Sequence, residues 1–509
     1  MNGRQKSEPP IVAVKPGNEA GRSAADPVER RGGAKENMAR PDTHRTQRRA
    51  SVPQGLDRVR QAAKARRTER FTALLHHVDV DLLRQSYLAL KRDAAPGIDG
   101  VTWQDYGEDL EAKLVDLHSR VHRGAYRAQP SRRRMIPKPD GRQRPLGIAA
   151  LEDKIVQRAV VEVLNAVYEE DFLGFSYGFR PGRSQHDALD ALAAGIAHRK
   201  VNWILDADIR SFFDTVDHTW VLRFVEHRIG DRRILRLIRK WLKAGVMEAG
   251  VVTAGEVGTP QGAVASPLLA NIYLHYVFDL WANRWRQRAA RGEMILVRYA
   301  DDIVVGFQHQ ADALGFQADL RDRLEAFALS LHPDKTRVIE FGRFAARDRR
   351  RRGLGQPETF TFLGFTHICS QSRAGQFLLK RKSRRDRQAA KLGEIRDGLR
   401  RRMHWPLAEQ RVWVRAVVQG YFAYHAVPTN FRSLTAFLWK VRWLWFRSLR
   451  RRSQKDGTTW KRFDRVTAVR LPKPKILHPW PQDRFAVKHP RWKPGAVVPH
   501  AGFCAGGAG

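Results

Sequence analysis

The sequence has 509 residues, of which 42% are hydrophobic, so the chain is long enough for several domains with buried cores. It carries 92 Lys and Arg residues against 53 Asp and Glu, which gives a net charge of +39 at pH 7. This excess would strain a compact fold by self-repulsion, and we expect nucleic acid to be the polyanion that neutralises it. An anionic membrane surface is the weaker alternative, because no lipidation signal or isolated basic amphipathic anchor stands out.

Targeting and redox signals are sparse in this sequence. No apolar segment follows the first residues, and nowhere do 18 consecutive apolar residues occur, so we expect neither a secretory signal nor a spanning helix. The two cysteines, Cys369 and Cys504, make no disulfide scaffold and no metal-type pair. A soluble, cytoplasmic protein is predicted.

The composition changes several times along the chain. Residues 1–70 are rich in Arg, Pro, Gly, Ala and Ser and predict a disordered basic tail, because they cannot bury enough surface to offset the entropy of ordering. Residues 71–370 alternate short apolar strands with helical stretches, as in an α+β domain. Residues 375–455 show helical spacing without strand signals, and residues 456–509 predict a small, basic nucleic-acid-binding module.

Three segments carry the clearest periodicity. Residues 201–209 predict one strand, and residues 294–307 predict two strands around a tight turn. Apolar residues at helical spacing predict a long helix over residues 431–452, with arginines on its other side.

An acidic pair lies in the turn between the two strands of residues 294–307. The sequence there is ILVRYADDIVV, with Asp301 and Asp302 between two β-branched runs. Asp is a common turn former, so a plain turn is the alternative interpretation. The flanking strands look buried on both faces, however, and two adjacent carboxylates there repel each other and lose hydration unless cations compensate. Hard divalent ions with oxygen ligands would do so.

The strand at residues 201–209 offers a third carboxylate. Alternation puts Asp206 and Asp208 on one strand face, and Asp208 lies at the end of the strand. Three carboxylates from two strands meet the requirement of a two-metal phosphoryl-transfer site. For the remaining acidic neighbours, Asp206, Asp214 and Asp217, we favour surface or helix-cap roles.

Several blocks, taken in chain order, resemble the retroid polymerases. RYADD at 298–302 resembles their catalytic motif, and ADI at 207–209, running on to Phe213, resembles their first palm motif. The other matching blocks are IPKPDG at 136–141, RPLGI at 144–148, SYGFRP at 176–181, GTPQG at 258–262, SPLLAN at 266–271, DKT at 334–336 and FLGF at 362–365. Together they resemble the bacterial group II intron-encoded reverse transcriptases, over roughly residues 72–500.

The resemblance implies a metal site. Asp208, Asp301 and Asp302 would be the catalytic carboxylates and would hold two Mg²⁺ ions, for which Mn²⁺ could substitute. The carbonyl of Ile209 would be an extra metal ligand.

The resemblance also implies nucleotide contacts. Lys138 and Arg144 would contact the incoming triphosphate, and Gln261 would support the incoming nucleotide. A solvated lysine and a polar turn residue are the plain alternatives for Lys138 and Gln261. The primer grip would comprise Phe362, Leu363 and Gly364.

Phe213 follows Asp208 by five residues, and the resemblance puts its ring under the sugar of the incoming nucleotide. A ring there would clash with a 2′-hydroxyl, so DNA is the expected product. The alternative is that Phe213, like Phe212, is part of the core.

The region after residue 375 resembles the maturase domain, which is also the polymerase thumb. GYFAY at 420–424 and the helix ending in LRRRSQ at 449–454 carry the likeness. Basic helix faces with interleaved aromatics suit RNA contact, although most of the aromatic stripe is expected to be core. The RNA-binding candidates are Arg447, Arg450, Arg451 and Arg452. Many related proteins end in an HNH endonuclease with paired cysteines, which this sequence lacks, so priming from an existing 3′ end is expected.

The sequence therefore predicts an α+β right-hand polymerase, with fingers and palm followed by a helical thumb, that copies RNA into DNA. Its expected partners are a group II intron RNA, a DNA target and primer, and dNTPs, with a role in splicing and retrohoming. One alternative is a non-enzymatic splicing cofactor, which the presence of all three carboxylates disfavours. The other is a host-adopted enzyme without an intron, for example in antiviral defence.

Overall fold

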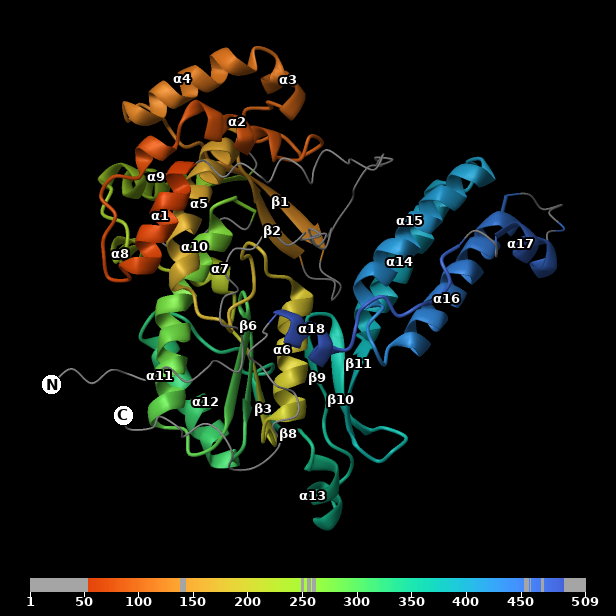
Figure 1. The fold of residues 1–509 in the computed structure, drawn as a ribbon. Coiled ribbons are helices and arrows are strands. Elements are labelled where there is room, and N and C mark those ends of the chain that lie inside the picture. Colours follow the sequence, from red (N-terminus) through yellow and green to blue (C-terminus); the bar gives the residue numbers. More distant parts are fainter. Residues whose placement is uncertain are drawn as a thin grey trace.

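The computed structural model describes residues 54–137, 143–248, 251–253, 258, 262–452, 457, 459–467 and 471–488. Within these residues the chain forms a right hand whose parts follow one another in the sequence (Figure 1). The fingers lie above the palm sheet, and the helical thumb projects to one side. The mixed α+β architecture confirms the predicted fold class.

The fingers are helices around a small sheet with the strand order β2-β1-β4-β5. The long helix α5 is central, because apolar residues surround most of it and α1, α2 and α10 pack on it. The fingers helices are α1 (Gln54–Ala65), η3 (Leu75–His77), α2 (Val80–Leu88), α3 (Trp103–Gly107), α4 (Leu110–His122) and α5 (Leu151–Asp171). The strands are β1 (Ser131–Pro137), β2 (Gln143–Ile148), β4 (Val246–Glu248) and β5 (Val251–Thr253).

The palm is an antiparallel sheet with the order β6-β7-β3-β8, against which α6 and α12 pack. Its strands are β3 (Trp203–Asp208), β6 (Met294–Tyr299), β7 (Asp302–Phe307) and β8 (Arg337–Glu340). The strand predictions for residues 201–209 and 294–307 are confirmed. The palm helices are α6 (Gln185–His198), α7 (Phe212–Thr215), α8 (His218–Glu226), α9 (Arg232–Lys243), α10 (Ser266–Leu274), η4 (His275–Asp279), α11 (Leu280–Arg288), α12 (Gln310–Glu325) and α13 (Ala345–Arg351).

Side-chain caps fix where the palm helices begin. Ser184 and Asp187 form a reciprocal capping box at the start of α6. The Asp217 carboxylate accepts a hydrogen bond from the Trp220 backbone N–H, 2.9 Å away, so the helix-cap role expected for Asp217 is confirmed. Asp214 is exposed in the first turn of α7, as a surface role requires.

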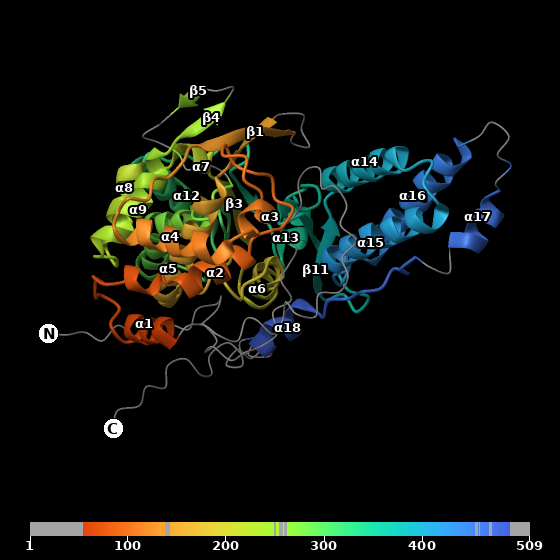
Figure 2. The same ribbon diagram turned by 90° about the horizontal axis from the view of Figure 1, so that it is seen from above.

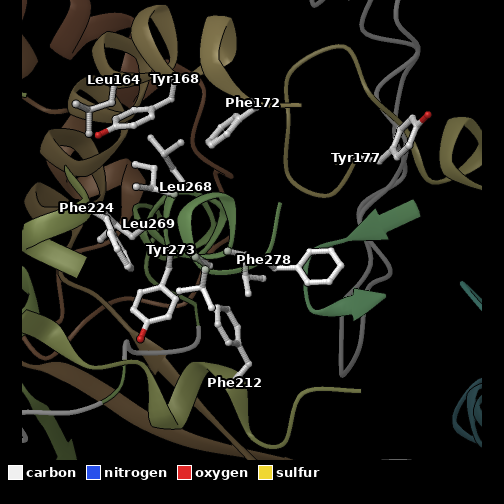
Figure 3. Packing of buried hydrophobic residues seen from close by; sticks show 14 of the residues in the cluster. Leu164, Tyr168, Phe172, Tyr177, Phe212, Phe224, Leu268, Leu269, Tyr273 and Phe278 are labelled. Carbon is white, nitrogen blue, oxygen red and sulfur yellow. The ribbon is translucent and has the colours of Figure 1, made fainter. Parts of the chain in front are cut away.

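Aromatic side chains of several helices pack together around α10. Figure 3 shows Tyr168 of α5, Phe212 of α7, Phe224 of α8 and Tyr273 of α10 converging there. The Tyr273 ring makes edge contacts with Phe224 and Phe212, at centroid distances of 5.2 and 6.2 Å. Burying each such ring stabilises the fold by about 1.5–3 kcal/mol, which ties the start of α7 firmly to α10.

The thumb begins later than the sequence predicts. A three-stranded sheet of β9 (Phe360–Phe362), β10 (Phe365–Gln371) and β11 (Phe377–Ser383) precedes its helices, so the boundary predicted at 370–375 was wrong. It was missed because β11 is basic and reads as a solvated helix face. The thumb helices are α14 (Arg385–Arg401), α15 (Leu407–His425), α16 (Phe431–Arg450) and α17 (Trp460–Thr467), and α16 confirms the helix predicted over 431–452. Figure 2 shows them side by side, away from the palm.

The described part of the segment 456–509 packs on the thumb and the palm rather than forming a separate module, while its predicted nucleic-acid binding stays a prediction. Phe463 of α17 is buried in the thumb core. Helix α18 (Pro481–Lys488) packs against α6 of the palm, where Arg484 pairs with Asp190 and Lys488 lies 2.5 Å from Asp187. Long-range pairing of this kind leaves no signal in local composition. Residues 489–509 lie outside the described residues.

The disorder predicted for residues 1–70 was wrong from residue 54 onward. Helix α1 packs against α5 and buries Leu56, Val59 and Ala63. Arg228 then fixes the end of this segment by donating to the carbonyl of Glu69, 2.6 Å away. The few apolar residues of α1 all fall on one face, which the overall composition concealed. Residues 1–53 lie outside the described residues. None of the described helices is long and apolar enough to span a membrane.

Candidate active site

The palm strands bring the predicted carboxylates together at one end of the sheet. Antiparallel pairing of β3 with β7 sets Asp208 directly opposite Asp302. Side chains in such opposite positions have Cβ atoms about 4.5–5.5 Å apart. Asp301 lies in the two-residue turn between Tyr299 and Asp302. All three acidic residues therefore lie at the same sheet end, where the sequence predicts a metal site.

The turn that carries Asp301 is strained and tightly supported. Ala300 has a φ of +56°, a left-handed conformation that costs a residue with a Cβ about 1–2 kcal/mol. The backbone of Gly178 lies directly against this turn, since a Cβ on Gly178 would come within 2.3 Å of the Ala300 nitrogen. Glycine is therefore required at position 178, and the SYGFRP block supports the hairpin that carries Asp301 and Asp302.

A buried ion pair holds the hairpin from below. Arg298 and Asp279 are both fully buried and form two hydrogen bonds, of 2.7 and 2.6 Å. The same guanidinium donates to the Ala300 carbonyl at 3.0 Å, to Asn271 at 3.1 Å and to the Ser176 hydroxyl at 2.7 Å. The guanidinium of Arg298 thus makes five hydrogen bonds. A buried charge is tolerated when it is paired and its hydrogen-bonding groups are satisfied in this way.

This network connects three blocks that the sequence shows only as separate motifs. The π-helical turn η4 carries Asp279, and Asn271 of α10 also donates to the Gly178 carbonyl at 2.7 Å. Asp279 was not predicted as a site residue, because an isolated acidic residue at the end of an apolar helix gives no signal of its partner. Arg298 is part of the RYADD motif, but the sequence did not predict its role in holding the hairpin.

The charges around the carboxylates are partly balanced. The Lys335 ammonium lies 2.7 Å from the Asp208 carboxylate, and both groups have solvent access. Asp302 is exposed at the tip of the sheet, yet the surrounding palm atoms, and after them the charges of Asp301 and Asp208, raise its pKa. Arg387 of the thumb opposes this shift. Lys335 and Arg387 therefore offset part of the negative charge of this site.

Asp206 differs from its predicted surface or cap role. It lies in the middle of β3, opposite Val304, and caps no helix. Burial, and to a smaller extent the charge of Asp208, raise the pKa of Asp206 to about 6, although Arg337 opposes the shift. Asp206 is therefore a half-buried acid, and burial makes its ionised form less stable than it is in the unfolded chain.

This position gives the first prediction, for the variant Asp206→Asn. The unfolded chain titrates Asp near pH 4, whereas folded Asp206 titrates near 6, so the folded state holds the proton more tightly. The free energy of unfolding therefore falls as pH rises between these values, and Asn, which cannot ionise, avoids that loss. We expect the variant to melt at a higher temperature than the wild type above about pH 6 and at the same temperature below about pH 4. A variant that melts lower above pH 6 would contradict the assignment.

The donor set suits a hard divalent cation. Within the described residues, no three acidic or histidine side chains already stand at metal-ligand spacing, and Asp208 is turned towards Lys335. Carboxylate oxygens from two adjacent strands are nevertheless the ligands that Mg²⁺ prefers. A cation would reverse the raised pKa of Asp302, and the exposed side chain of Lys335 is free to move aside. Ile209 is buried just beyond the end of β3, bridged to Leu331.

The two phenylalanines after β3 have different environments. Phe212 is buried and its ring meets Phe213 edge to face, at a centroid distance of 5.4 Å. Phe213 is only half-buried, so its ring has an open side. The structure therefore assigns Phe212 to the core, and Phe213 remains the candidate for a sugar contact.

The predicted triphosphate contacts are partly described. Arg144 lies in β2, opposite Ile136 of β1. Lys138 and Gln261 lie outside the described residues. The ends of the block around Gln261 are described: Gly258 lies against the backbone of Asp214, and a Cβ on Gly262 would come within 2.7 Å of the Gly147 carbonyl. The two described ends of this block therefore contact the palm and the fingers, respectively.

The predicted primer grip is a tight hairpin turn beside the carboxylates. Phe362 and Phe365 pair across it, while Leu363 and Gly364 both have positive φ, of 45° and 80°. The Tyr424 hydroxyl of the thumb donates to the Leu363 carbonyl at 2.7 Å. A Cβ on Gly364 would lie 3.3 Å from the Arg387 guanidinium, whose charge reaches Asp302. Arg387 thus links this turn to the carboxylates, and nothing distinguishes it from other arginines in the sequence.

The four arginines at the end of α16 differ in what they contact. Arg447 and Arg450 are exposed and lie over the rings of Trp443 and Phe446, at 4.7 and 5.9 Å, and Arg451 is exposed. Arg452 instead donates to the Trp405 carbonyl, 2.5 Å away, and so closes the loop between α14 and α15. Three of the four therefore remain accessible to a ligand.

Comparison with known proteins supplies the family. The family described as "Reverse transcriptase (RNA-dependent DNA polymerase)" matches residues 136–367. "Protein YkfC" of Escherichia coli (strain K12) is 34% identical over 323 residues, which are 57% of this chain and 80% of that protein. "Group II intron-encoded protein LtrA" of Lactococcus lactis subsp. cremoris is 34% identical over 222 residues, 43% of this chain and 37% of LtrA. A 91 kDa protein in a cob intron of Schizosaccharomyces pombe is 41% identical over 154 residues, 30% of this chain and 19% of that protein.

The family match spans the elements that carry the acidic residues. It includes β3 with Asp208 and the β6–β7 hairpin with Asp301 and Asp302, and it extends into β10. Together with the relatives, this match identifies the chain as a member of the group II intron-encoded reverse transcriptases.

Proposed function

We propose that this chain polymerises DNA on an RNA template at the end of the palm sheet where β3 meets β7, and that it binds a group II intron RNA as template and splicing substrate. The observation that carries the proposal is the register of these strands, which sets Asp208 opposite Asp302 with Asp301 in the adjoining turn. Like charges in opposite strand positions destabilise a sheet, so Asp208 and Asp302 reduce the stability of the palm unless cations compensate them.

Asp208, Asp301 and Asp302 would hold two Mg²⁺ ions, with the Ile209 carbonyl as a further ligand. When bound, these ions lower the pKa of the primer 3′-hydroxyl and offset the charge of the triphosphate and of the leaving pyrophosphate.

The other residues of the site would orient the reactants. The buried Arg298–Asp279 pair would fix the position of the turn that carries Asp301, because Arg298 donates a hydrogen bond to the Ala300 carbonyl in that turn. The Leu363–Gly364 turn, tied to Tyr424 of the thumb, would hold the primer end, as expected for the primer grip. Lys138, Arg144 and Gln261 would contact the dNTP from the fingers side.

The primer-extension test of this proposal depends on metal. A DNA primer annealed to an RNA template should be extended by the purified chain with dNTPs and Mg²⁺, and removal of the metal with EDTA should stop extension. Binding of the template–primer should persist in EDTA, because it rests on the basic surface rather than on the carboxylates. Extension that continues in EDTA would overturn the metal assignment.

Phe213 gives a prediction about the sugar. The half-buried ring of Phe213 lies five residues after Asp208, where it would meet the 2′-position of the incoming nucleotide. The variant Phe213→Val removes the ring but keeps an apolar side chain, so we expect it to incorporate rNTPs at least tenfold better relative to dNTPs, since removing a steric clash of about 1.4 kcal/mol suffices for that factor. The matched variant Phe212→Leu should keep the sugar preference, because Phe212 is core. Unchanged selectivity in Phe213→Val, measured by single-nucleotide extension, would refute the contact.

The thumb offers a surface for the intron RNA. Three large aromatic residues of α16, Phe431, Trp439 and Trp443, are exposed by 51%, 56% and 39%. They alternate with exposed Arg432, Lys440 and Arg447 along the face of α16 that is turned away from the thumb core. Aromatic rings interleaved with cations suit unpaired bases and RNA phosphates.

The intron role is tested by competition. The chain should bind the RNA transcribed from its own flanking sequence more tightly than an unrelated structured RNA of equal length, at physiological salt. Equal affinity would favour the alternative of a host-adopted reverse transcriptase without an intron, while leaving the polymerase proposal intact.

A further inference from the structure

A basic helical arm projects from the palm at the sheet end opposite to the active site. The α13 arm comprises residues 343–355, between β8 and β9. Because Arg337 of β8 pairs with Asp206 and Glu340 pairs with Trp203, the chain leaves β8 at the far end of β3. Six residues of strand place this point about 17 Å from Asp208. Figure 1 shows α13 beyond the lower edge of the palm sheet, on the side away from the fingers.

The arm carries far more positive charge than its folding requires. Six arginines and only two acidic residues lie between Glu340 and Arg352. Three of these arginines anchor the arm: Arg349 and Arg352 pair with the buried Glu340, and Arg343 donates to the Ala197 carbonyl at the end of α6, 2.6 Å away.

The other three arginines have no such task. Arg350 and Arg351 are exposed and have no ion-pair partner among the described residues. Arg347 is exposed and pairs only with the adjacent surface residue Asp348, at 3.0 Å. A position near the helix C-terminus stabilises a cation by about 0.3–1 kcal/mol at most, and self-repulsion among neighbouring arginines opposes that gain.

An exposed aromatic ring lies beside these cations. Phe344 is 40% exposed, whereas its neighbour Ala345 is buried, so the ring is not needed to anchor the helix. The Arg347 guanidinium lies 4.7 Å from the centre of the Phe344 ring. Leu354, at the other end of the arm, is 47% exposed. A ring backed by a guanidinium and flanked by free arginines has the chemistry that holds a stacked base and the phosphates on either side of it.

We propose that the α13 arm is a second nucleic-acid site that binds single-stranded RNA, with phosphates on Arg347, Arg350 and Arg351 and a base on Phe344. The arm lies too far from Asp208 to touch the reacting nucleotide, so it would hold a part of the RNA that is not being copied. The choice of RNA over another polyanion rests on the proposed function. The position, the charge and the exposed ring of the arm are observed independently of that function.

The test measures salt-dependent binding of a long oligo(U) probe, which has no secondary structure, to the full chain. Each phosphate contact with a single strand contributes about 0.7 to the slope of log affinity against log salt. The variant Arg347→Gln/Arg350→Gln/Arg351→Gln should therefore lower the slope by about 2 and weaken binding roughly tenfold or more at physiological salt. Phe344→Ala should weaken binding on the order of fivefold without changing the slope, because it removes stacking but no charge.

A matched control separates the arm from total charge. Arg232, Arg236 and Arg239 are exposed on α9, which Figure 1 shows beside the fingers while α13 lies at the lower edge, and their replacement by Gln removes the same number of charges. This control should keep the wild-type slope. An equal fall in both triple variants, or a loss seen with a DNA duplex and not with oligo(U), would overturn the proposal. An arm-specific loss supports it even if the wild type fails to extend a primer, a result that would refute the proposed polymerase function alone.

Discussion

The variant Asp302→Asn should lose polymerisation almost completely while becoming slightly more stable. Asp302 faces Asp208 across the β3–β7 pair, and its pKa is raised by the palm atoms around its carboxyl group and by the neighbouring charges. Asn keeps the size of the side chain but cannot offer an anionic ligand, and losing several kcal/mol of transition-state stabilisation slows the reaction roughly a thousandfold. Single-turnover extension on an RNA template measures this loss.

The gain in stability distinguishes a functional carboxylate from a structural one. Removing one of two like charges in opposite strand positions should raise the free energy of unfolding by a few tenths to about 1 kcal/mol in metal-free buffer. A residue that the fold needed would instead destabilise the protein when changed. Denaturant unfolding in EDTA checks the sign, and an Asp302→Asn protein that is both less stable and fully active would contradict the site.

The variant Asp279→Asn should lower both stability and activity. Among the described residues, Asp279 is the only carboxylate that forms an ion pair with the fully buried Arg298. Neutralising one partner of a buried ion pair costs about 3–5 kcal/mol of folding stability. Because the same guanidinium holds the Ala300 carbonyl, the turn with Asp301 should lose its fixed position. We expect kcat to fall and the Mg²⁺ concentration for half-maximal activity to rise, with Asp279→Glu restoring part of both.

A matched variant separates positioning from loss of folded protein. Asp171 pairs with the buried Arg228 at 2.7 Å, and Arg228 gives its other hydrogen bonds to backbone carbonyls of residues 63–69 rather than to the hairpin. Asp171→Asn should destabilise the fold to a similar degree, yet the folded fraction should keep the wild-type Mg²⁺ dependence. If both variants change that dependence equally, Arg298 and Asp279 have no special link to the hairpin.

The active-site carboxylates could be predicted because their signals are local. Strand periodicity over a few residues puts Asp208 at the end of one strand, and β-branched runs on both sides of Asp301 and Asp302 define a hairpin. Pairing of these strands then follows from their shared burial, and the register in β3 and β7 agrees. The family blocks were informative for the same reason, since each lies in one short segment.

The parts that could not be predicted depend on contacts between distant segments. Asp279 becomes a positioning residue only because η4 lies beneath the hairpin, and Arg387 reaches Asp302 only because the thumb folds back on the primer-grip turn. The same holds for α18, whose Arg484 finds Asp190 on a helix nearly three hundred residues earlier. Basic composition, which marks so much of this chain, hid the difference between Arg452, which closes a loop, and the exposed Arg447.

The thumb and the palm are joined at three places that the sequence does not reveal. Tyr424 binds the primer-grip turn, Arg381 of β11 shares the buried Asp190 with Arg484, and the rings of His186 and His478 lie 4.0 Å apart. Burial lowers the pKa of both histidines, so this contact is between neutral rings. The thumb is therefore held at a defined position relative to the carboxylates.

One measurement tests the central claim most directly: incorporation of dTTP on poly(rA) primed with oligo(dT), in Mg²⁺, by the wild type and by Asp301→Asn. The affinity of both proteins for the template–primer is measured alongside. Asp301 lies in the turn held by the Ala300 carbonyl and Arg298, so its loss should affect chemistry and leave binding unchanged. The account predicts incorporation by the wild type and none by the variant. Full activity in Asp301→Asn, or no incorporation by a wild type that binds the template–primer, would contradict it.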